Sequence, residues 1–123
     1  MAGARHLLRG ERAERIAEDH LVRNGLTILE RNYRSREGEI DLIAEDRGTI
    51  VFVEVRLREE RSPHRFGGAA ASITPAKQRR IAMAAQHYLS TRRELPPCRF
   101  DVVLLGSLDK DAPEWIKAAF AAD

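Results

Sequence analysis

Apolar residues recur at helical spacing in the first part of the chain. Between about Arg9 and Asn24 they follow the pattern i, i+3, i+4, i+8, at Ala13, Ile16, Ala17 and Leu21. This spacing is typical of one buried face of a helix. Gly25 follows at a position where helices commonly end, because glycine adopts the left-handed conformation of a helix stop without strain. The pattern therefore predicts a helix over residues 9–24.

Alternation of apolar and polar residues then predicts three strands. The segments are LTILERNY at 26–33, GEIDLIAED at 38–46 and TIVFVEVRL at 49–57. Arg47 and Gly48 separate the last two, as the central residues of a two-residue hairpin turn would. Asp46 would then face Thr49, and each facing pair would have residue numbers that sum to 95.

This register sorts the hairpin side chains into two faces. One face is apolar, and it pairs Ala44 with Val51, Leu42 with Val53 and Ile40 with Val55. The other face pairs Ile43 with Phe52, Asp41 with Glu54 and Glu39 with Arg56. A shift by one residue would scramble both faces, so the pattern favours this even register.

The rest of the chain predicts a loop, a long helix and a last strand. Residues 58–72 combine Pro, Gly and charged residues as loops do. Thr74 and Pro75 then form an N-cap and a first helical residue, opening a helix to about Thr91. RFDVVLL at 99–105 reads as a buried strand, and EWIKAAF at 114–120 fits either a strand or a short helix. No linker is visible, so we expect a single domain over residues 1–123.

Two acidic residues interrupt the apolar strands and need partners. Asp41 and Glu54 would face each other with Cβ atoms about 4.5–5.5 Å apart, where like charges repel. A divalent metal, a nearby arginine such as Arg56, or a shared proton would relieve the repulsion. Two carboxylates on rigid strands suit Mg²⁺ or Mn²⁺, which take oxygen ligands. A salt-bridge cluster with Arg56 explains the spacing equally well.

Two further charged residues have unusual positions. Glu14 falls at the edge of the apolar stripe of the first helix, where it either points towards the sheet or joins Glu11 and Glu18 on the solvent side. Lys77 stands at the third position of the second helix, where a positive charge opposes the helix dipole. There it is badly placed for stability and well placed for a phosphate, unless it simply extends into solvent.

Composition and charge narrow the class of protein. The chain has 123 residues, 43% hydrophobic and 33% charged, as expected for a folded, soluble domain. No apolar run approaches the roughly 20 residues of a membrane span, and no secretion signal opens the chain, so we expect a cytoplasmic location and no membrane partner. The lone Cys98 is expected to be a small buried hydrophobe. Between Arg56 and Arg80, seven basic residues outweigh two glutamates, which favours a phosphate-bearing partner.

Several motifs resemble a known family. RNYRSREGEIDLIA, VFVEVR, TPAKQRRI and RFDVV, preceded by AERIAEDHLVRNG, are similar to the YraN-like family of uncharacterised bacterial proteins. That family resembles the restriction-endonuclease-like superfamily, and especially the archaeal Holliday junction resolvases. The similarity runs from about Glu14 to Phe120. It implies an α/β fold: an α/β/α core whose mixed central sheet of about four to five strands is flanked by helices.

The resemblance also implies a metal site. Its acidic ligands would be Glu14, Asp41 and Glu54, with the backbone carbonyl of Val55 completing the shell around Mg²⁺ or Mn²⁺. Two residues after Glu54 the superfamily usually has a lysine, whereas this chain has Arg56. An arginine stays protonated and cannot act as a general base, so Lys77 is a candidate substitute.

We therefore weigh two functions. The first is a metal-dependent endonuclease that cleaves phosphodiester bonds of nucleic acid, with DNA, and branched DNA in particular, as the expected substrate. Its catalytic candidates are Asp41, Glu54, Arg56 and Lys77, and a homodimer is compatible with the resemblance. The second is a module that binds nucleic acid or a protein without cutting, which Arg56 favours. Phosphate-binding candidates in both cases are Arg34, Arg36, Arg58, Arg65, Lys77, Arg79 and Arg80. Tyr33 and Phe66 are candidates for stacking on bases, or for anchoring the core or a loop.

Overall fold

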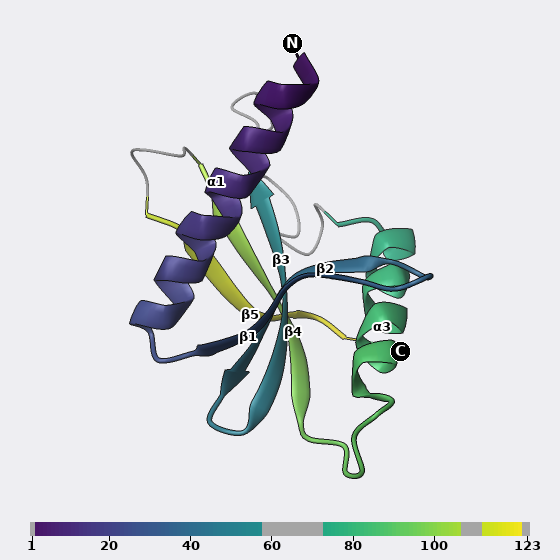
Figure 1. The fold of residues 1–123 in the computed structure, drawn as a ribbon. Coiled ribbons are helices and arrows are strands. Elements are labelled where there is room, and N and C mark those ends of the chain that lie inside the picture. Colours follow the sequence, from purple (N-terminus) through teal and green to yellow (C-terminus); the bar gives the residue numbers. More distant parts are fainter. Residues whose placement is uncertain (1, 58–72, 107–111, 122–123) are drawn as a thin grey trace.

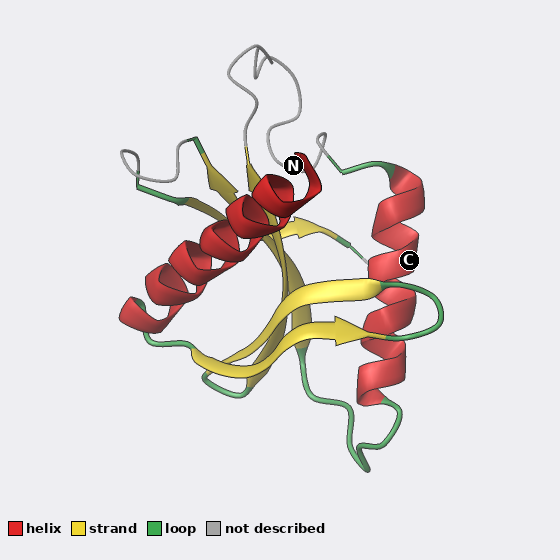
Figure 2. Cartoon of the chain, turned by 45° about the horizontal axis from the view of Figure 1, so that its top comes forward, coloured by secondary structure: helices red, strands yellow, loops and turns green. Residues whose placement is uncertain are grey.

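A five-stranded mixed sheet carries a helix on each face (Figures 1 and 2). The structure, a computed structural model, describes residues 2–57, 73–106 and 112–121. Strand order follows the sequence, β1-β2-β3-β4-β5, and in this sheet β3 and β4 run parallel while the other neighbours are antiparallel. The described elements are α1 (Ala2–Arg23), β1 (Thr27–Arg34), β2 (Glu39–Asp46), β3 (Thr49–Leu57), α3 (Pro75–Leu89), β4 (Cys98–Leu105) and β5 (Glu114–Phe120).

Each face of the sheet has its own apolar core, because neighbouring strand residues point to opposite sides. On the α1 side, Ala17 and Leu21 are fully buried against a sheet surface that includes Val51 and Val103. On the α3 side, Ile81 and Ala84 pack against a surface that includes Phe52. The expected α/β/α layering with a mixed central sheet is confirmed.

The predicted elements match the structure closely, with differences at their ends. The first helix begins at Ala2 rather than near Arg9, since the residues ahead of the apolar stripe include good helix formers such as alanine and arginine. Gly25, with φ 94°, ends it as expected. The ambiguous segment 114–120 is a strand, β5. Residues 58–72, predicted as a loop, lie outside the described residues.

The β2–β3 turn has the predicted register. Arg47 and Gly48 have φ values of 51° and 88°, as both central residues of a type I′ turn must. Asp46 pairs with Thr49, and the even register continues to Leu42 and Val53. A positive φ is uncommon for a residue such as Arg47, so this turn holds a less favourable residue than the usual Asn or Asp.

Beyond Leu42 and Val53, β2 and β3 separate. From there β2 pairs only with β1, and β3 only with β4. Ile40 lies in the α3-side core, whereas Val55 packs on the α1 side, so the predicted pairing of these two residues on one apolar face is wrong. The predicted Glu39–Arg56 pair is likewise absent from the register.

The tip of the β1–β2 hairpin explains the separation. It reaches across to α3 (Figures 1 and 2), where Gly38 lies so close that an added Cβ would stand 2.9 Å from the carbonyl oxygen of Arg80. Tyr33 packs edge-on against Tyr88 with ring centroids 5.4 Å apart. This packing draws β2 away from β3, and the fork that results is where the predicted acidic pair lies.

Candidate active site

Asp41 and Glu54 meet at the fork between β2 and β3. Glu54 is 5% exposed, an unusual degree of burial for a carboxylate. Asp41 is half-buried, and its Oδ2 accepts a hydrogen bond of 2.8 Å from the backbone N–H of Val55. A side chain thus bridges the two strands just where their ladder stops. The Asp41 carboxyl also hydrogen-bonds the Glu54 side chain, so the predicted proximity of the two acids is present.

Burial and charge strongly disfavour ionisation of Asp41. Burial is the largest cause, and repulsion by Glu54 is the second; together they raise the pKa of Asp41 to about 8, and Glu14 adds to the repulsion. The N–H of Val55 opposes the shift because it stabilises the charged form. At neutral pH Asp41 therefore holds a proton, which it can donate to Glu54. A shared proton is one of the three partners that the sequence left open.

A lysine provides the second partner. Lys77 Nζ lies 2.7 Å from Glu54 Oε2, while the nearest guanidinium nitrogen of Arg56 lies 3.9 Å from the same oxygen. Lys77 is placed by the first turn of α3, where its backbone N–H donates to Thr74 Oγ1 at 3.1 Å and confirms the predicted N-cap. Of the two basic side chains, the lysine from the helix makes the closer contact with the buried carboxylate.

Glu14 approaches the same site from α1. It is half-buried, and burial is the largest cause of its raised pKa. The Asn32 side chain donates a hydrogen bond that opposes the shift, and the charges of Glu39, Glu11 and Glu54 raise it further. These interactions favour the sheet-facing interpretation of Glu14 over the solvent-facing one.

The carboxylates offer oxygen ligands but no complete cage. Among the described residues no group of three His, Cys, Asp or Glu side chains is arranged to hold a metal ion. Mg²⁺ needs no such group, since it binds through one or two carboxylates with water and substrate phosphate filling the other positions. Asp41 and Glu54, with Glu14 and the Val55 carbonyl as further oxygen donors, fit that requirement. A cation would also offset the repulsion by Glu54, which adds to the effect of burial in raising the pKa of Asp41.

The hairpin tip brings some of the predicted phosphate-binding residues near α3. Arg34 and Arg36 belong to the tip region, and Arg79 and Arg80 to the part of α3 that Gly38 contacts. All four side chains are exposed, and Arg34 forms an ion pair with Glu39 at 3.3 Å. Arg58, Arg65 and Phe66 lie outside the described residues.

Tyr33 has a structural role in the described chain. Its hydroxyl forms a short hydrogen bond with His87 Nδ1, and its ring packs on Tyr88. Both contacts join the hairpin to α3. Of the two interpretations given for Tyr33, the geometry favours the anchor over the base-stacking platform.

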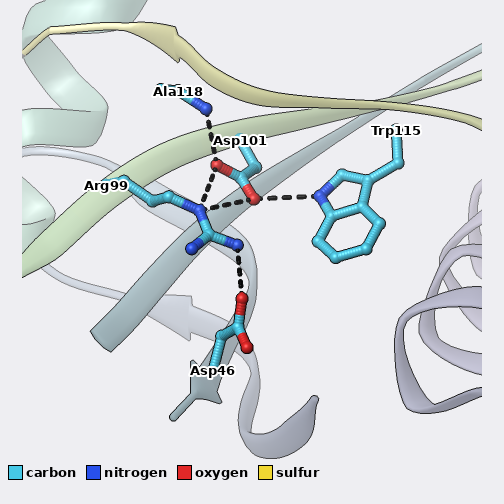
Figure 3. A network of polar contacts seen from close by, with 5 residues as sticks. All are labelled: Asp46, Arg99, Asp101, Trp115 and Ala118. Atoms are coloured by element: carbon cyan, nitrogen blue, oxygen red, sulfur yellow. Dashed lines mark hydrogen bonds and ion pairs between the residues drawn. The ribbon is translucent and has the colours of Figure 1, made fainter. Parts of the chain in front are cut away.

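The sequence interpretation missed a second buried carboxylate, Asp101 (Figure 3). This residue of β4 is fully buried and accepts four hydrogen bonds. Arg99 Nε donates to both carboxylate oxygens at 3.1 Å. Trp115 Nε1 and the Ala118 backbone N–H, both from β5, donate at 2.9 Å each. The signal in the sequence was the same as for Asp41, a lone acid within an apolar strand.

One other expectation was wrong, because Cys98 is exposed. It is the first residue of β4, at the end of the strand where the buried run of Phe100 to Leu105 has not yet begun. A small apolar residue at a strand end gains little burial, so its chemical type was a poor guide to its position.

Comparisons with known proteins all point to one family. The sequence model of the uncharacterised protein family UPF0102 matches residues 13–105. A UPF0102 protein of Cupriavidus taiwanensis is 58% identical over 117 residues, covering 94% of this chain and 84% of its own. One from Methylobacillus flagellatus is 50% identical over 113 residues, covering 92% and 96%. One from Alkalilimnicola ehrlichii is 50% identical over 123 residues, covering 98% and 93%. Within the described residues, no helix is long and apolar enough to cross a membrane.

Proposed function

The chain belongs to the UPF0102 family, the YraN-like proteins whose motifs it shares, and from the site within this framework we propose that it is a metal-dependent endonuclease of nucleic acid. The observation that carries the proposal is the acidic pair at the fork, with Lys77 Nζ 2.7 Å from Glu54. A buried acid, a half-buried acid and a lysine, brought together from β3, β2 and α3, are costly for stability. Such costly arrangements concentrate at functional sites.

The residues of the site would have different roles, in metal binding, in orienting a ligand and in phosphate binding. Glu54 and Asp41, with Glu14 and the Val55 carbonyl, are the groups that would hold Mg²⁺ or Mn²⁺. The ion would supply positive charge to a phosphodiester and lower the pKa of water. Val55 N–H keeps the Asp41 carboxylate aimed into the fork. Lys77 neutralises Glu54 and presents an ammonium group at the helix N-terminus, where a phosphate is favoured.

Lys77 rather than Arg56 would take the place of the missing strand lysine. Its ammonium is nearer to Glu54 by more than 1 Å, as the distances of 2.7 and 3.9 Å show. An ammonium can also change its pKa when partly buried, whereas a guanidinium cannot release its proton. Although position 56 has an arginine where the superfamily usually has a lysine, the site would therefore still have a lysine, Lys77, beside Glu54.

Exposed arginines would bind the rest of the substrate. Arg36, Arg79 and Arg80 lie on the hairpin tip and on α3, the two elements that border the fork on the α3 side. Contacts of this kind go to phosphates, so affinity would depend on salt and only weakly on base sequence. DNA, and branched DNA in particular, is the substrate that we propose to test first.

A non-cleaving module is the alternative that one contact favours. In the described structure Lys77 already neutralises Glu54, and Asp41 keeps its proton, so the site is electrostatically balanced without an ion. A protein whose acidic pair is balanced in this way would bind nucleic acid through its arginines and leave it intact.

The test is cleavage of labelled four-way DNA junctions, linear duplexes and matching RNAs with and without Mg²⁺ or Mn²⁺. We expect metal-dependent cleavage that Asp41→Asn and Glu54→Gln abolish. Asp19→Asn, an exposed acid of α1, is the matched control and should cleave as the parent does. Binding of any of these substrates with no cleavage in either metal would refute the nuclease and support the module.

A further inference from the structure

A cavity of about 570 Å³ lies at the opposite end of β3 from the acidic pair. Its walls come from the end of α1 (Asn24, Gly25), the β2–β3 turn (Asp46, Arg47, Thr49) and β5 (Trp115, Lys117). The volume falls within the roughly 300–1,000 Å³ of small-molecule sites. Thr49 and Glu54 are five residues apart on the strand, about 17 Å, so the two sites are distinct.

The aromatic wall of this cavity is held rigidly. Trp115 donates its indole N–H to the fully buried Asp101 at 2.9 Å (Figure 3), and His20 packs edge-on against the ring with centroids 6.3 Å apart. The polar edge of the indole is thus satisfied, while the side chain is only half-buried and lines the cavity. A fixed, partly exposed ring is a ready surface for stacking, since little side-chain entropy remains to be lost.

Two cations border that surface. Lys117 Nζ lies 4.5 Å from the centroid of the Trp115 ring, and Arg47 stands at the turn. Among the described residues that line the cavity, Asp46 alone has a carboxylate, and Arg99 already binds it at 3.0 Å. The lining therefore carries positive charge that is not neutralised by its own acid, next to an aromatic ring.

The backbone has a positive φ at Arg47, which lines the cavity, and at Ala118, which is the neighbour of a lining residue. Arg47 has φ 51° where Asn, Asp or Gly is preferred, and Ala118, directly after Lys117, also has φ 51°. Positive φ values at residues other than glycine are uncommon, and they occur at ligand sites as well as in turns.

We propose that this cavity binds a nucleotide, with the planar base stacked on Trp115 and the phosphate held by Lys117 and Arg47. Stacking on an aromatic side chain tolerates any base, and an arginine or lysine at the edge of the ring is the usual partner of the phosphate. Lys117 would move off the indole to make room, exchanging its cation–π contact for an ion pair with the phosphate. The nucleotide is either free or an unstacked residue of a strand.

Trp115 is the only tryptophan of the chain, so its fluorescence reports on this cavity alone. The experiment titrates the full chain with 5′-mononucleotides, with short single-stranded DNA and RNA, and with inorganic phosphate, in EDTA. We expect saturable quenching by nucleotides and none by phosphate alone. Quenching by mononucleotides identifies a free nucleotide as sufficient, whereas quenching by oligonucleotides alone identifies a strand, and both support the proposal.

Three variants make the test specific. Arg47→Asn removes the cation and places at the turn a residue that accepts a positive φ, so the fold should not suffer. Lys117→Gln removes the other cation, and each variant should weaken binding about tenfold. Arg92→Gln, whose side chain contacts Tyr88 on α3, is the matched control and should bind as the parent does.

The outcome separates this site from the acidic pair. Asp41→Asn should leave nucleotide binding unchanged, so failure of the nuclease proposal would not affect this result. The nucleotide proposal is overturned by the absence of quenching with every nucleotide and strand. It is also overturned by equal affinity of parent, Arg47→Asn and Lys117→Gln, or by equal quenching with phosphate alone.

Discussion

Replacing Asp41 by asparagine should stabilise the protein near neutral pH. The pKa of Asp41 is about 8 in the folded chain, against 3.8 when the group is unperturbed. Between these values the folded chain binds one proton more than the unfolded chain, so stability falls as pH rises, by about 1.4 kcal/mol per unit. At about pH 7 the accumulated cost approaches roughly 4 kcal/mol, which is an upper limit because the site relaxes around a buried charge.

Asparagine removes this cost without removing the main contact. It has nearly the same shape, cannot ionise, and keeps a carbonyl oxygen that can accept from Val55 N–H. We therefore expect Asp41→Asn to match the parent near about pH 4 and to exceed it by a few kcal/mol near about pH 8. The window follows from the two pKa values, and the sign is that of a carboxyl whose folded pKa is raised.

Urea unfolding followed by circular dichroism measures this difference across the pH range. An unchanged slope with a higher midpoint would show that stability, and not compactness, has changed. Asp19→Asn controls for the loss of a surface charge and should stay within about 0.5 kcal/mol of the parent at every pH. Parallel pH profiles for the parent and Asp41→Asn, with no gain near pH 8, would refute the account of a strained acidic pair.

Three other substitutions test the contacts that build the site. Lys77→Gln removes the ammonium 2.7 Å from the buried Glu54 carboxylate, so the free energy of unfolding in urea should fall by about 1–3 kcal/mol. Lys77→Arg should recover part of this loss, and an unchanged midpoint for Lys77→Gln would contradict the ion pair. Gly38→Ala places a Cβ 2.9 Å from the Arg80 carbonyl oxygen and should lower the free energy of unfolding by about 1–3 kcal/mol. Gly10→Ala, in open space on α1, is the control and should raise it by about 0.5–1 kcal/mol. Similar effects at both positions would show that the hairpin does not depend on close contact with α3. Thr74→Ala removes the acceptor for the Lys77 backbone N–H, so the free energy of unfolding should fall by about 1 kcal/mol, whereas Thr74→Ser should retain most of it. Equal losses for both variants would argue against the helix cap.

The sequence was informative where local chemistry decides the structure. Arg47-Gly48 between two alternating segments specifies a two-residue turn, and the turn fixes the register as far as Leu42 and Val53, the residues next to Asp41 and Glu54. Thr74 and Pro75 specify the helix start, and the start positions Lys77. Each inference used residues that are neighbours along the chain or across one hairpin, where few alternatives compete.

It failed where packing between distant elements decides. The fork exists because Gly38 and Tyr33 pack on residues of α3 that lie 42 and 55 positions further along the chain. No pattern within β2 indicates that Ile40 points to the α3 side. The hydrogen-bond donors of Asp101 could not be predicted for a related reason. Its donors on β5 become neighbours only when that strand joins the sheet beside β4.

The four hydrogen bonds to Asp101 also bear on how the sheet comes apart. β5 pairs with β4 alone in the described sheet, and edge strands of this kind often detach before the rest of a domain. Detaching β5 would strip two donors from a carboxylate in the interior of the protein, a far larger penalty than the loss of ladder bonds by themselves. Opening of the edge is thereby tied to global unfolding, so the β5 amide protons that bond to β4 should exchange with deuterium nearly as slowly as those of β4.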